Sequence, residues 1–195
     1  APSTSRRRQR RAGQRDALEG GRHDDGAATC PQSGAGYVSA MPRPDTPLPD
    51  GVLDLLNGRR SGFTQLIGLR FVHASYDEMV VEAPVTEALH QPYGLVHGGV
   101  YAAIIETAAS AGAAINAMPF GQSCVGLENT TSFIRAVREG TLTGRATPVT
   151  RGRRTHVWEV AVTGDDGKLV ATGRVRMLCI EGGGQVAGER VALKT

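Results

Sequence analysis

One carboxylate stands alone in a long apolar stretch of this sequence. Residues 98–117 are mostly Ala, Ile and other small residues, and Glu106 is the only charged side chain among them. A carboxylate on a buried helix is costly unless it is paired, hydrogen-bonded or reached by water in a pocket. Glu106 is therefore a candidate acid, base or nucleophile. The alternative is a structural carboxylate that reaches solvent or pairs with an arginine.

The residues before this stretch suggest what the carboxylate acts on. His-Gly-Gly at 97–99 leads from a turn into the predicted helix, whose first N–H groups are unpaired and favour negative charge. Glycine lets a ligand atom approach the backbone, so the N–H of Gly98 could stabilise an oxyanion. Gln91 precedes the His-Gly-Gly turn. Ser110, one turn after Glu106, could hold a water beside the carboxylate.

Hydrophobic patterning predicts the elements that position these residues. We expect a short helix near 52–57 and the long helix over 98–117. Strands are expected at 66–74, 79–84, 124–133, 141–150, 155–163 and 169–180. Pro148 predicts a bulged or edge strand, and Asp-Asp-Gly-Lys at 165–168 predicts a hairpin turn. One long helix on a mostly antiparallel sheet is an α+β arrangement.

Composition excludes several classes of protein. The chain has 195 residues, 40% hydrophobic and 21% charged, which is typical of a globular domain. Residues 1–50 hold 8 Lys and Arg against 6 Asp and Glu, so the remaining 14 against 13 leave the body nearly neutral. The arginine run at 6–11 has no interleaved aromatic residues and no apolar segment after it. We therefore expect neither a nucleic-acid partner nor an export signal.

The long apolar helix raises the question of a membrane span. Its length would suffice, but Ala and Gly dominate it and Glu106, Ser110 and Asn116 interrupt it. We therefore expect no membrane partner and a helix covered by the sheet or by a partner subunit. The expected organisation is a disordered extension at 1–48, a domain at 49–181 and a flexible tail at 182–195. Met41 is a candidate start of the natural chain.

Cysteine and histidine spacing predicts no metal site. The three cysteines are Cys30, Cys124 and Cys179. They share no CxxC spacing, which excludes a zinc ribbon, argues against a disulfide framework and favours a cytoplasmic protein. The histidines at 90, 97 and 156 lack ligand spacing. Cys124 and Cys179 are expected as buried small hydrophobes, and His156 and Trp158, which alternate on one strand, as core or interface residues.

The motifs together resemble the hotdog-fold acyl-CoA thioesterases. They are Gln-Pro-Tyr-Gly-Leu-Val-His-Gly-Gly at 91–99, Glu106, Val-Gly-Leu-Glu at 125–128, Arg135, Arg-Glu-Gly at 138–140 and Gly-Arg-Arg-Thr-His-Val-Trp at 152–158. The similarity covers about residues 60–180. It is greatest to the branch with a glutamate on the helix, which contains 4-hydroxybenzoyl-CoA and 1,4-dihydroxy-2-naphthoyl-CoA thioesterases.

The resemblance implies a role for each candidate. Gln91 would position the thioester, the Gly98 N–H would polarise its carbonyl, and His97 would lie near the departing sulfur. Glu106 would be the nucleophile or the general base, and Ser110 would orient water. A thiolate leaves readily, so no strong general acid is required, and coenzyme A is part of the substrate rather than a separate cofactor.

The resemblance also directs attention to arginines that could hold the phosphates of coenzyme A. The candidates are Arg135, Arg138, Arg153 and Arg154, with Arg151 nearby. The position of Arg135 matches a coenzyme-contacting arginine of the family. Phe133 replaces a histidine of the naphthoyl-CoA members, which argues against that particular substrate. The alternative for each arginine is a solvated side chain at the end of a strand.

These observations predict a cytoplasmic thioesterase that acts on an aryl- or medium-chain acyl-CoA. Gly98 and Glu106 are eight residues apart, roughly 12 Å along a helix, so one thioester carbon could not readily reach both in one chain. We therefore expect a homodimer with shared active sites, and the resemblance implies a homotetramer. A thioesterase for acyl-carrier protein and a non-catalytic acyl-CoA-binding regulator remain the alternatives.

Overall fold

The computed structural model describes residues 44–60 and 62–190. The helices are α1 (Val52–Gly58), α2 (Gly62–Leu66) and α3 (Gly98–Ala117), with 3₁₀ turns η1 (Glu87–Leu89) and η2 (Met118–Phe120). The main strands are β1 (Arg70–Ala74), β2 (Met79–Pro84), β5 (Gln122–Phe133), β6 (Thr141–Arg151), β7 (Thr155–Thr163) and β8 (Leu169–Glu181). Two short hairpins pair β3 (His90–Gln91) with β4 (Leu95–Val96), and β9 (Gln185–Val186) with β10 (Glu189–Arg190).

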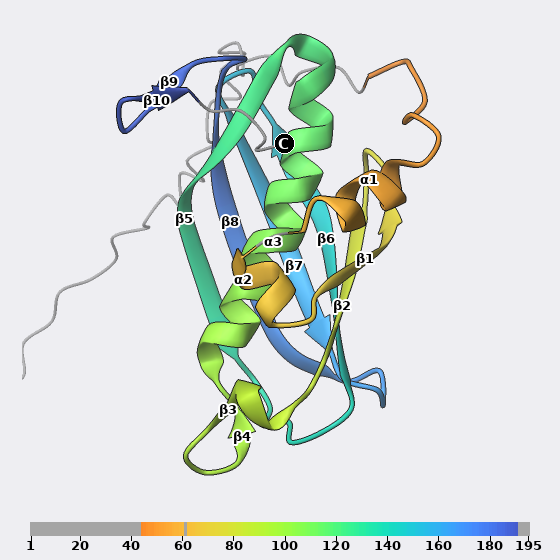
Figure 1. Cartoon of the computed structure of the whole chain (residues 1–195), viewed down its shortest axis with the longest axis vertical. Coiled ribbons are helices and arrows are strands. Elements are labelled where there is room, and N and C mark those ends of the chain that lie inside the picture. Colours follow the sequence, from red (N-terminus) through yellow and green to blue (C-terminus); the bar gives the residue numbers. More distant parts are fainter. Residues whose placement is uncertain (1–43, 61, 191–195) are drawn as a thin grey trace, which may run out of the picture. The chain divides into compact units, whose positions relative to one another are not determined.

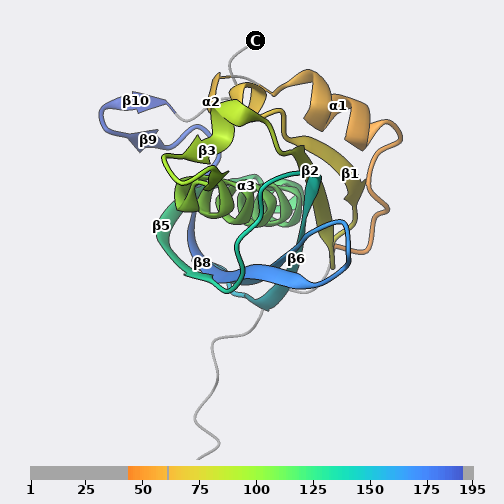
Figure 2. The ribbon, with the colours of Figure 1, turned by 90° about the horizontal axis from the view of Figure 1, so that it is seen from below.

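The six main strands form one antiparallel sheet in the order β1-β2-β6-β7-β8-β5 (Figure 1). The sheet curves around α3, which Figure 2 shows end-on inside the curve. This is the predicted α+β arrangement of one long helix and six strands, the hotdog fold. The predicted bulge is confirmed too, since the β6–β7 register shifts between Pro148 and Thr150.

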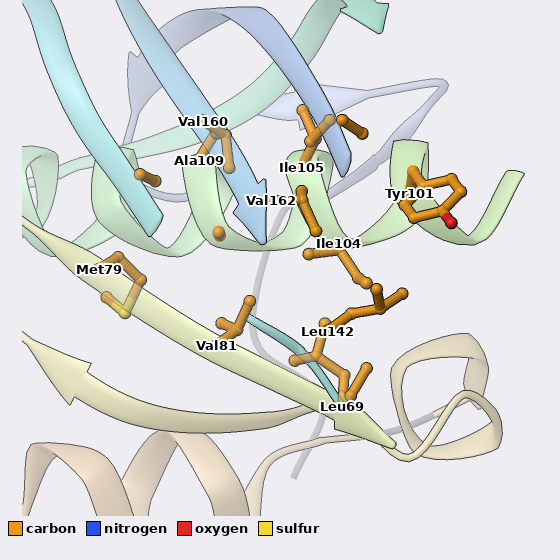
Figure 3. Packing of buried hydrophobic residues seen from close by; sticks show 14 of the residues in the cluster. Leu69, Met79, Val81, Tyr101, Ile104, Ile105, Ala109, Leu142, Val160 and Val162 are labelled. Atoms are coloured by element: carbon orange, nitrogen blue, oxygen red, sulfur yellow. The ribbon is translucent and has the colours of Figure 1, made fainter. Parts of the chain in front are cut away.

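The helix lies close to the sheet because glycines leave room for it. A Cβ atom on Gly112 of α3 would lie 2.6 Å from the Trp158 ring, and one on Gly144 of β6 would lie 2.5 Å from Ile104. Both distances are shorter than carbon atoms can approach, so α3 needs glycine at each crossing. Figure 3 shows the resulting core, with side chains of α3 among those of β2, β6 and β7.

The apolar character of α3 follows from this packing. The segment Gly98–Phe120 is long and apolar enough to cross a membrane, and half of its apolar window is buried within the structure. Ile104, Ile105 and Ala109 have no exposed surface. Burial against the sheet thus accounts for an apolar sequence on one side of the helix, as predicted.

The buried side of the sheet also contains the residues predicted for the core on β7. His156 is 1% exposed and Trp158 is 0% exposed, which confirms the core prediction.

The two cysteines of the sheet lie side by side. Cys179 is buried and Cys124 half-buried, with their sulfur atoms 3.5 Å apart. The hydrogen bond with the Cys124 thiol lowers the pKa of Cys179, and the neighbouring His156 lowers it further.

The first predicted strand is shorter than expected. The apolar run at 66–74 divides into the end of α2 and the strand β1, because Gly68 adopts a left-handed φ of 68° between them. Such a conformation interrupts strand pairing and favours glycine.

The domain limits proposed from the sequence can be followed only in part. Leu48, just before the expected start at 49, packs against the core. Gly182, just after the expected end, donates its N–H to Gly121 O at 2.7 Å, and the β9–β10 hairpin follows it. Most of the expected extension, with Cys30 and Met41, and the last five residues lie outside the described residues.

Candidate active site

Glu106 lies half-buried on α3 with both carboxylate oxygens hydrogen-bonded. Ser110, one turn later, donates its hydroxyl to Oε1 at 3.2 Å. Asn129 of β5 donates its Nδ2 to Oε2 at 2.9 Å and to the Ala102 carbonyl at 3.1 Å. The carboxylate is therefore held between its own helix and the edge strand, in a defined orientation.

Strand β5 is shaped to accept this carboxylate. A Cβ atom on Gly126 would lie 2.6 Å from Glu106 Oε1, so a side chain there would displace the carboxylate. Gly126 and Asn129 are three residues apart, and regular alternation would turn them to opposite faces. The β5–β8 pairing is irregular between Gly126 and Glu128, and this bulge allows both residues to contact Glu106.

At the N-terminus of α3, His97 caps the helix. Its Nδ1 accepts a hydrogen bond from the Gly99 N–H at 2.9 Å, which places the ring proton of a neutral imidazole on Nε2. The Gly98 N–H has no hydrogen-bond partner within residues 44–60 and 62–190. That N–H is therefore available to a ligand at the positive end of the helix dipole.

A cavity of about 280 Å³ opens beside this helix end. Its lining is mostly apolar and comprises Gln91, Leu95, Val96, Gly98, Tyr101, Phe133, Ile134, Arg135 and Ala136. Phe133 lies over Gly98, where a Cβ atom would be 2.7 Å from the ring, and its centroid is 5.9 Å from that of Tyr101. Burial raises the pKa of the Tyr101 hydroxyl.

A larger groove of about 550 Å³ is lined by residues 44–48 and 74–76. It contains none of the predicted site residues.

Gln91 projects from the β3–β4 hairpin at the same cavity. Its Oε1 accepts from the Tyr93 N–H at 2.8 Å, which leaves the Nε2 protons available as donors. Arg138 donates Nη1 to the carbonyls of Tyr93 and Gly94 at 3.0 and 2.9 Å, and His90 Nε2 lies 2.8 Å from the Arg138 carbonyl. Arg138, predicted as a phosphate ligand, thus holds the hairpin that carries Gln91.

Comparisons with known proteins agree with this fold. Residues 93–171 match the thioesterase superfamily. A protein from Mycobacterium tuberculosis named as an esterase is 39% identical over 143 residues, covering 72% of this chain and 97% of that protein. Its solved structure superposes with a TM-score of 0.60 over 61% of this chain and 96% of that one.

The chain belongs to the thioesterase superfamily. A 1,4-dihydroxy-2-naphthoyl-CoA hydrolase from Listeria monocytogenes is 35% identical over 113 residues, covering 58% of this chain and 91% of that protein. A mutant thioesterase from Pseudomonas aeruginosa superposes with a TM-score of 0.64 at 32% identity, over 68% of this chain and 95% of that one. The protein is therefore a thioester hydrolase with the hotdog fold, as the sequence motifs predicted.

The thioesterase places its candidate arginines at opposite ends of β5. Arg135 follows the end of the strand, lines the cavity and pairs with Asp166 at 3.3 Å. The carbonyl of Arg153 accepts from Gln122, the first residue of β5, and Arg154 is next to it. Twelve residues of strand span roughly 36 Å at ~3.3 Å per residue. A single chain therefore cannot bring these arginines to one phosphate.

The predicted site residues of the thioesterase form two separate groups. Gln91, Gly98 and Arg135 line the cavity, while Glu106 and Ser110 lie two turns farther along α3. The spacing along the sequence did not indicate the contribution of β5. Asn129 and Gly126, which hold the carboxylate from that strand, were missed because their common orientation depends on the bulge.

Proposed function

We propose that this thioesterase hydrolyses aryl- or medium-chain acyl-CoA thioesters, with Glu106 as nucleophile or general base. The observation that carries the proposal is the contrast between an anchored carboxylate and an unpaired helix N–H. Ser110 and Asn129 orient Glu106 without a countercharge, and the Gly98 N–H lacks a partner among the described residues. Acyl transfer needs both a base and an oxyanion donor.

In the proposed reaction, the carbonyl oxygen of the thioester first accepts a hydrogen bond from the Gly98 N–H. The Gln91 amide, whose Nε2 protons are available, holds the thioester beside it. Glu106 either attacks the carbonyl carbon or takes a proton from the attacking water. The carbon–sulfur bond then breaks, and coenzyme A leaves as a thiolate that takes up a proton. If water attacks, the acyl group is released directly as the free acid. If Glu106 attacks, water then hydrolyses the mixed anhydride, which releases the free acid and restores the carboxylate.

One chain does not bring these groups together, so we propose that two copies share each site. Gly98 and Glu106 are eight residues apart on α3, roughly 12 Å at ~1.5 Å per residue. Strand β5 is at the edge of the sheet and exposes Leu127, which is 49% accessible. Antiparallel pairing of two β5 strands about a two-fold axis would place Glu106 of one copy opposite Gly98 of the other.

The same pairing would bring the candidate arginines from the two ends of β5 close together. Because the two β5 strands would run in opposite directions, Arg153 and Arg154 of one copy would come to the end of β5 that carries Arg135 in the other. Three guanidinium groups would then surround one coenzyme binding site. Their charge suits the phosphates of coenzyme A, which Arg binds through paired hydrogen bonds.

The cavity supports an aromatic or medium-length acyl group. Tyr101, Phe133 and Ile134 provide its apolar walls, and aromatic faces stack with aryl rings. The Listeria monocytogenes relative named as a 1,4-dihydroxy-2-naphthoyl-CoA hydrolase supports an aryl substrate. A panel of aryl-, short- and long-chain acyl-CoA thioesters, assayed for release of free thiol, tests this. We expect the highest kcat/KM with aryl or medium-chain substrates, and a clear preference for long chains would contradict it.

Complementation tests the shared site. E106A and Q91A are expected to be impaired alone. After co-refolding with random pairing, about half of the dimers would be mixed and each would contain one intact site, so roughly a quarter of all sites would be wild type. Recovery of activity near that fraction supports two copies per site. Recovery no greater than the average of the two variants, with mixing verified by mass, would show that each chain acts alone.

A further inference from the structure

Three metal-ligand side chains from three strands converge at the end of the sheet near the start of β5. The ligand atoms of Cys124 (β5), His156 (β7) and Cys179 (β8) all lie within 4.8 Å of one another. Cys124 is directly opposite Cys179 in the β5–β8 register, and their sulfur atoms are 3.5 Å apart. His156 is paired with Met177, two residues before Cys179, so all three project from one face.

The imidazole in this cluster is buried without a hydrogen-bond partner. His156 is 1% exposed, and neither Nδ1 nor Nε2 has a partner in the part of the chain that the structure describes. Gln122 Oε1, two residues before Cys124 on β5, is also buried without a partner among the described residues. Buried polar groups are normally satisfied, and those that are not indicate a missing ligand or a functional role.

We propose that Cys124, His156 and Cys179 bind one Zn²⁺ ion per chain. Zinc bonds are about 2.3 Å to sulfur and 2.0–2.1 Å to nitrogen, so two sulfur ligands of a tetrahedral ion lie about 3.8 Å apart. The observed sulfur separation of 3.5 Å is close to this value. The two sulfur atoms are therefore already spaced as one ion requires, and a ring nitrogen of His156 lies within 4.8 Å of both.

Charge and ligand type favour zinc over Cu⁺, Mg²⁺ and Ca²⁺. Two thiolates and a neutral imidazole carry two negative charges, which a divalent ion neutralises, whereas Cu⁺ would leave a buried net charge. Mg²⁺ and Ca²⁺ prefer oxygen ligands and would not choose this set. On binding, the two thiol protons pass to solvent and two zinc–sulfur bonds form. The fourth coordination position is left for water.

The site would secure the strand beneath the catalytic carboxylate. Gly126, which contacts Glu106, follows Cys124 by two residues on β5, and the other two ligands are on the adjoining strands β8 and β7. A bound ion would therefore tie the edge strand to the sheet at this point. Zinc binding does not require the proposed thioesterase chemistry, so either proposal can fail without the other.

Cobalt binding tests the site directly. The full chain with Cys30→Ser, so that only Cys124 and Cys179 supply thiols, is reduced, stripped with a chelator and titrated with Co²⁺. We expect one ion per chain, an intense thiolate-to-cobalt absorption band, and displacement of the band by one equivalent of Zn²⁺. Absence of the band in the reduced protein would overturn the proposal.

Ligand variants identify the atoms involved. C124A and C179A should abolish the cobalt band, and H156Q should weaken binding by at least about 100-fold, because even outer contacts of a metal site are worth 10–100-fold. Met177→Leu, a neighbour of His156 with no ligand role, is the matched control and should bind like the parent. Circular dichroism checks that each variant is folded. Unchanged affinity in any folded ligand variant would show that the three residues do not form the site.

Discussion

The N-terminus and the middle of α3 are prepared for different tasks. At Gly98 the backbone N–H has no partner in the described chain and opens on an apolar cavity. At Glu106 both carboxylate oxygens are hydrogen-bonded, one by Ser110 and one by Asn129 of the edge strand. One region offers a backbone donor without a partner, and the other holds an oriented carboxylate. If each is half of one reaction centre, as we propose, changes in the two regions should have distinguishable effects.

Removal of the carboxylate should have the largest effect. We expect E106A and E106Q to lower kcat by at least about 100-fold, since neither methyl nor amide is a base or nucleophile. Melting temperature should change little, because Glu106 is only half-buried. Steady-state hydrolysis and thermal denaturation measure the two quantities. Wild-type turnover in either variant would exclude Glu106 from catalysis.

A methyl group beneath the carboxylate should be almost as damaging. In G126A the new Cβ atom would lie 2.6 Å from Glu106 Oε1, so the carboxylate must move. A displacement of about 1 Å can cost up to 100-fold, and we expect kcat to fall by about 10- to 100-fold. Gly164→Ala is the control, because its Cβ atom would be 3.6 Å from its nearest neighbour. Equal activity of the two variants would argue against a strict position for Glu106.

Loss of the strand-side hydrogen bond should have an intermediate effect. N129A removes the donor to Glu106 Oε2, and we expect kcat to fall by about tenfold, the lower end of the value of one hydrogen bond to a charged group. Thr131 donates to Asn129 Oδ1 at 2.7 Å and orients the amide, so T131V should be only a few-fold slower. If T131V is slower than N129A, Asn129 is not the main support of the carboxylate.

Variants of the two arginines near the cavity should affect different kinetic constants, KM for coenzyme binding and kcat for positioning of Gln91. Arg135 lines the cavity and is proposed to exchange its exposed pairing with Asp166 for a coenzyme phosphate. R135A should therefore raise KM several-fold with little change in kcat, and the penalty should shrink with 3′-dephospho-CoA thioesters. R138A releases the hairpin of Gln91 and should instead lower kcat. Steady-state kinetics of both variants with the CoA thioester and with its 3′-dephospho analogue distinguish the two roles. A KM effect confined to R138A would reverse the two assignments.

Loss of the helix cap should have the smallest effect on turnover. H97A removes the acceptor of the Gly99 N–H and should cost about 1 kcal/mol in the free energy of unfolding. H97N retains a capping side chain and should restore stability. We expect kcat of both variants to stay within about threefold of wild type, measured beside chemical denaturation. A fall of 100-fold in both would instead assign His97 to the departing sulfur.

The sequence predicted the fold well where patterns are long. The apolar stretch matched α3 from Gly98 to Ala117, and strands β5 to β8 lie where alternation placed them. Helix α2 and the β3–β4 hairpin were missed. Their segments are short, and their conformations depend on local features such as the positive φ of Gly68 and the arginine contacts to the hairpin. Periodicity cannot detect elements of so few residues.

The sequence predicted which residues are neighbours within one element but not between elements. Ser110 lies beside Glu106 because both are on one helix, where residues four apart always face the same way. Asn129 reaches the same carboxylate from β5, and the bulge that turns it there has no signature in the residue types. Cys124, His156 and Cys179 likewise meet through strand pairing, although their spacing along the chain predicted no cluster.

By itself, the sequence determined the class of fold, the buried helix and the isolated carboxylate upon it. These follow from local composition and periodicity, which act between residues a few positions apart. Only the tertiary structure decided which strand supports Glu106, that Arg138 holds a hairpin, and that thiols and an imidazole share one buried face. Such contacts join residues that are distant along the chain, and they depend on register, where a shift of one residue reverses every side chain.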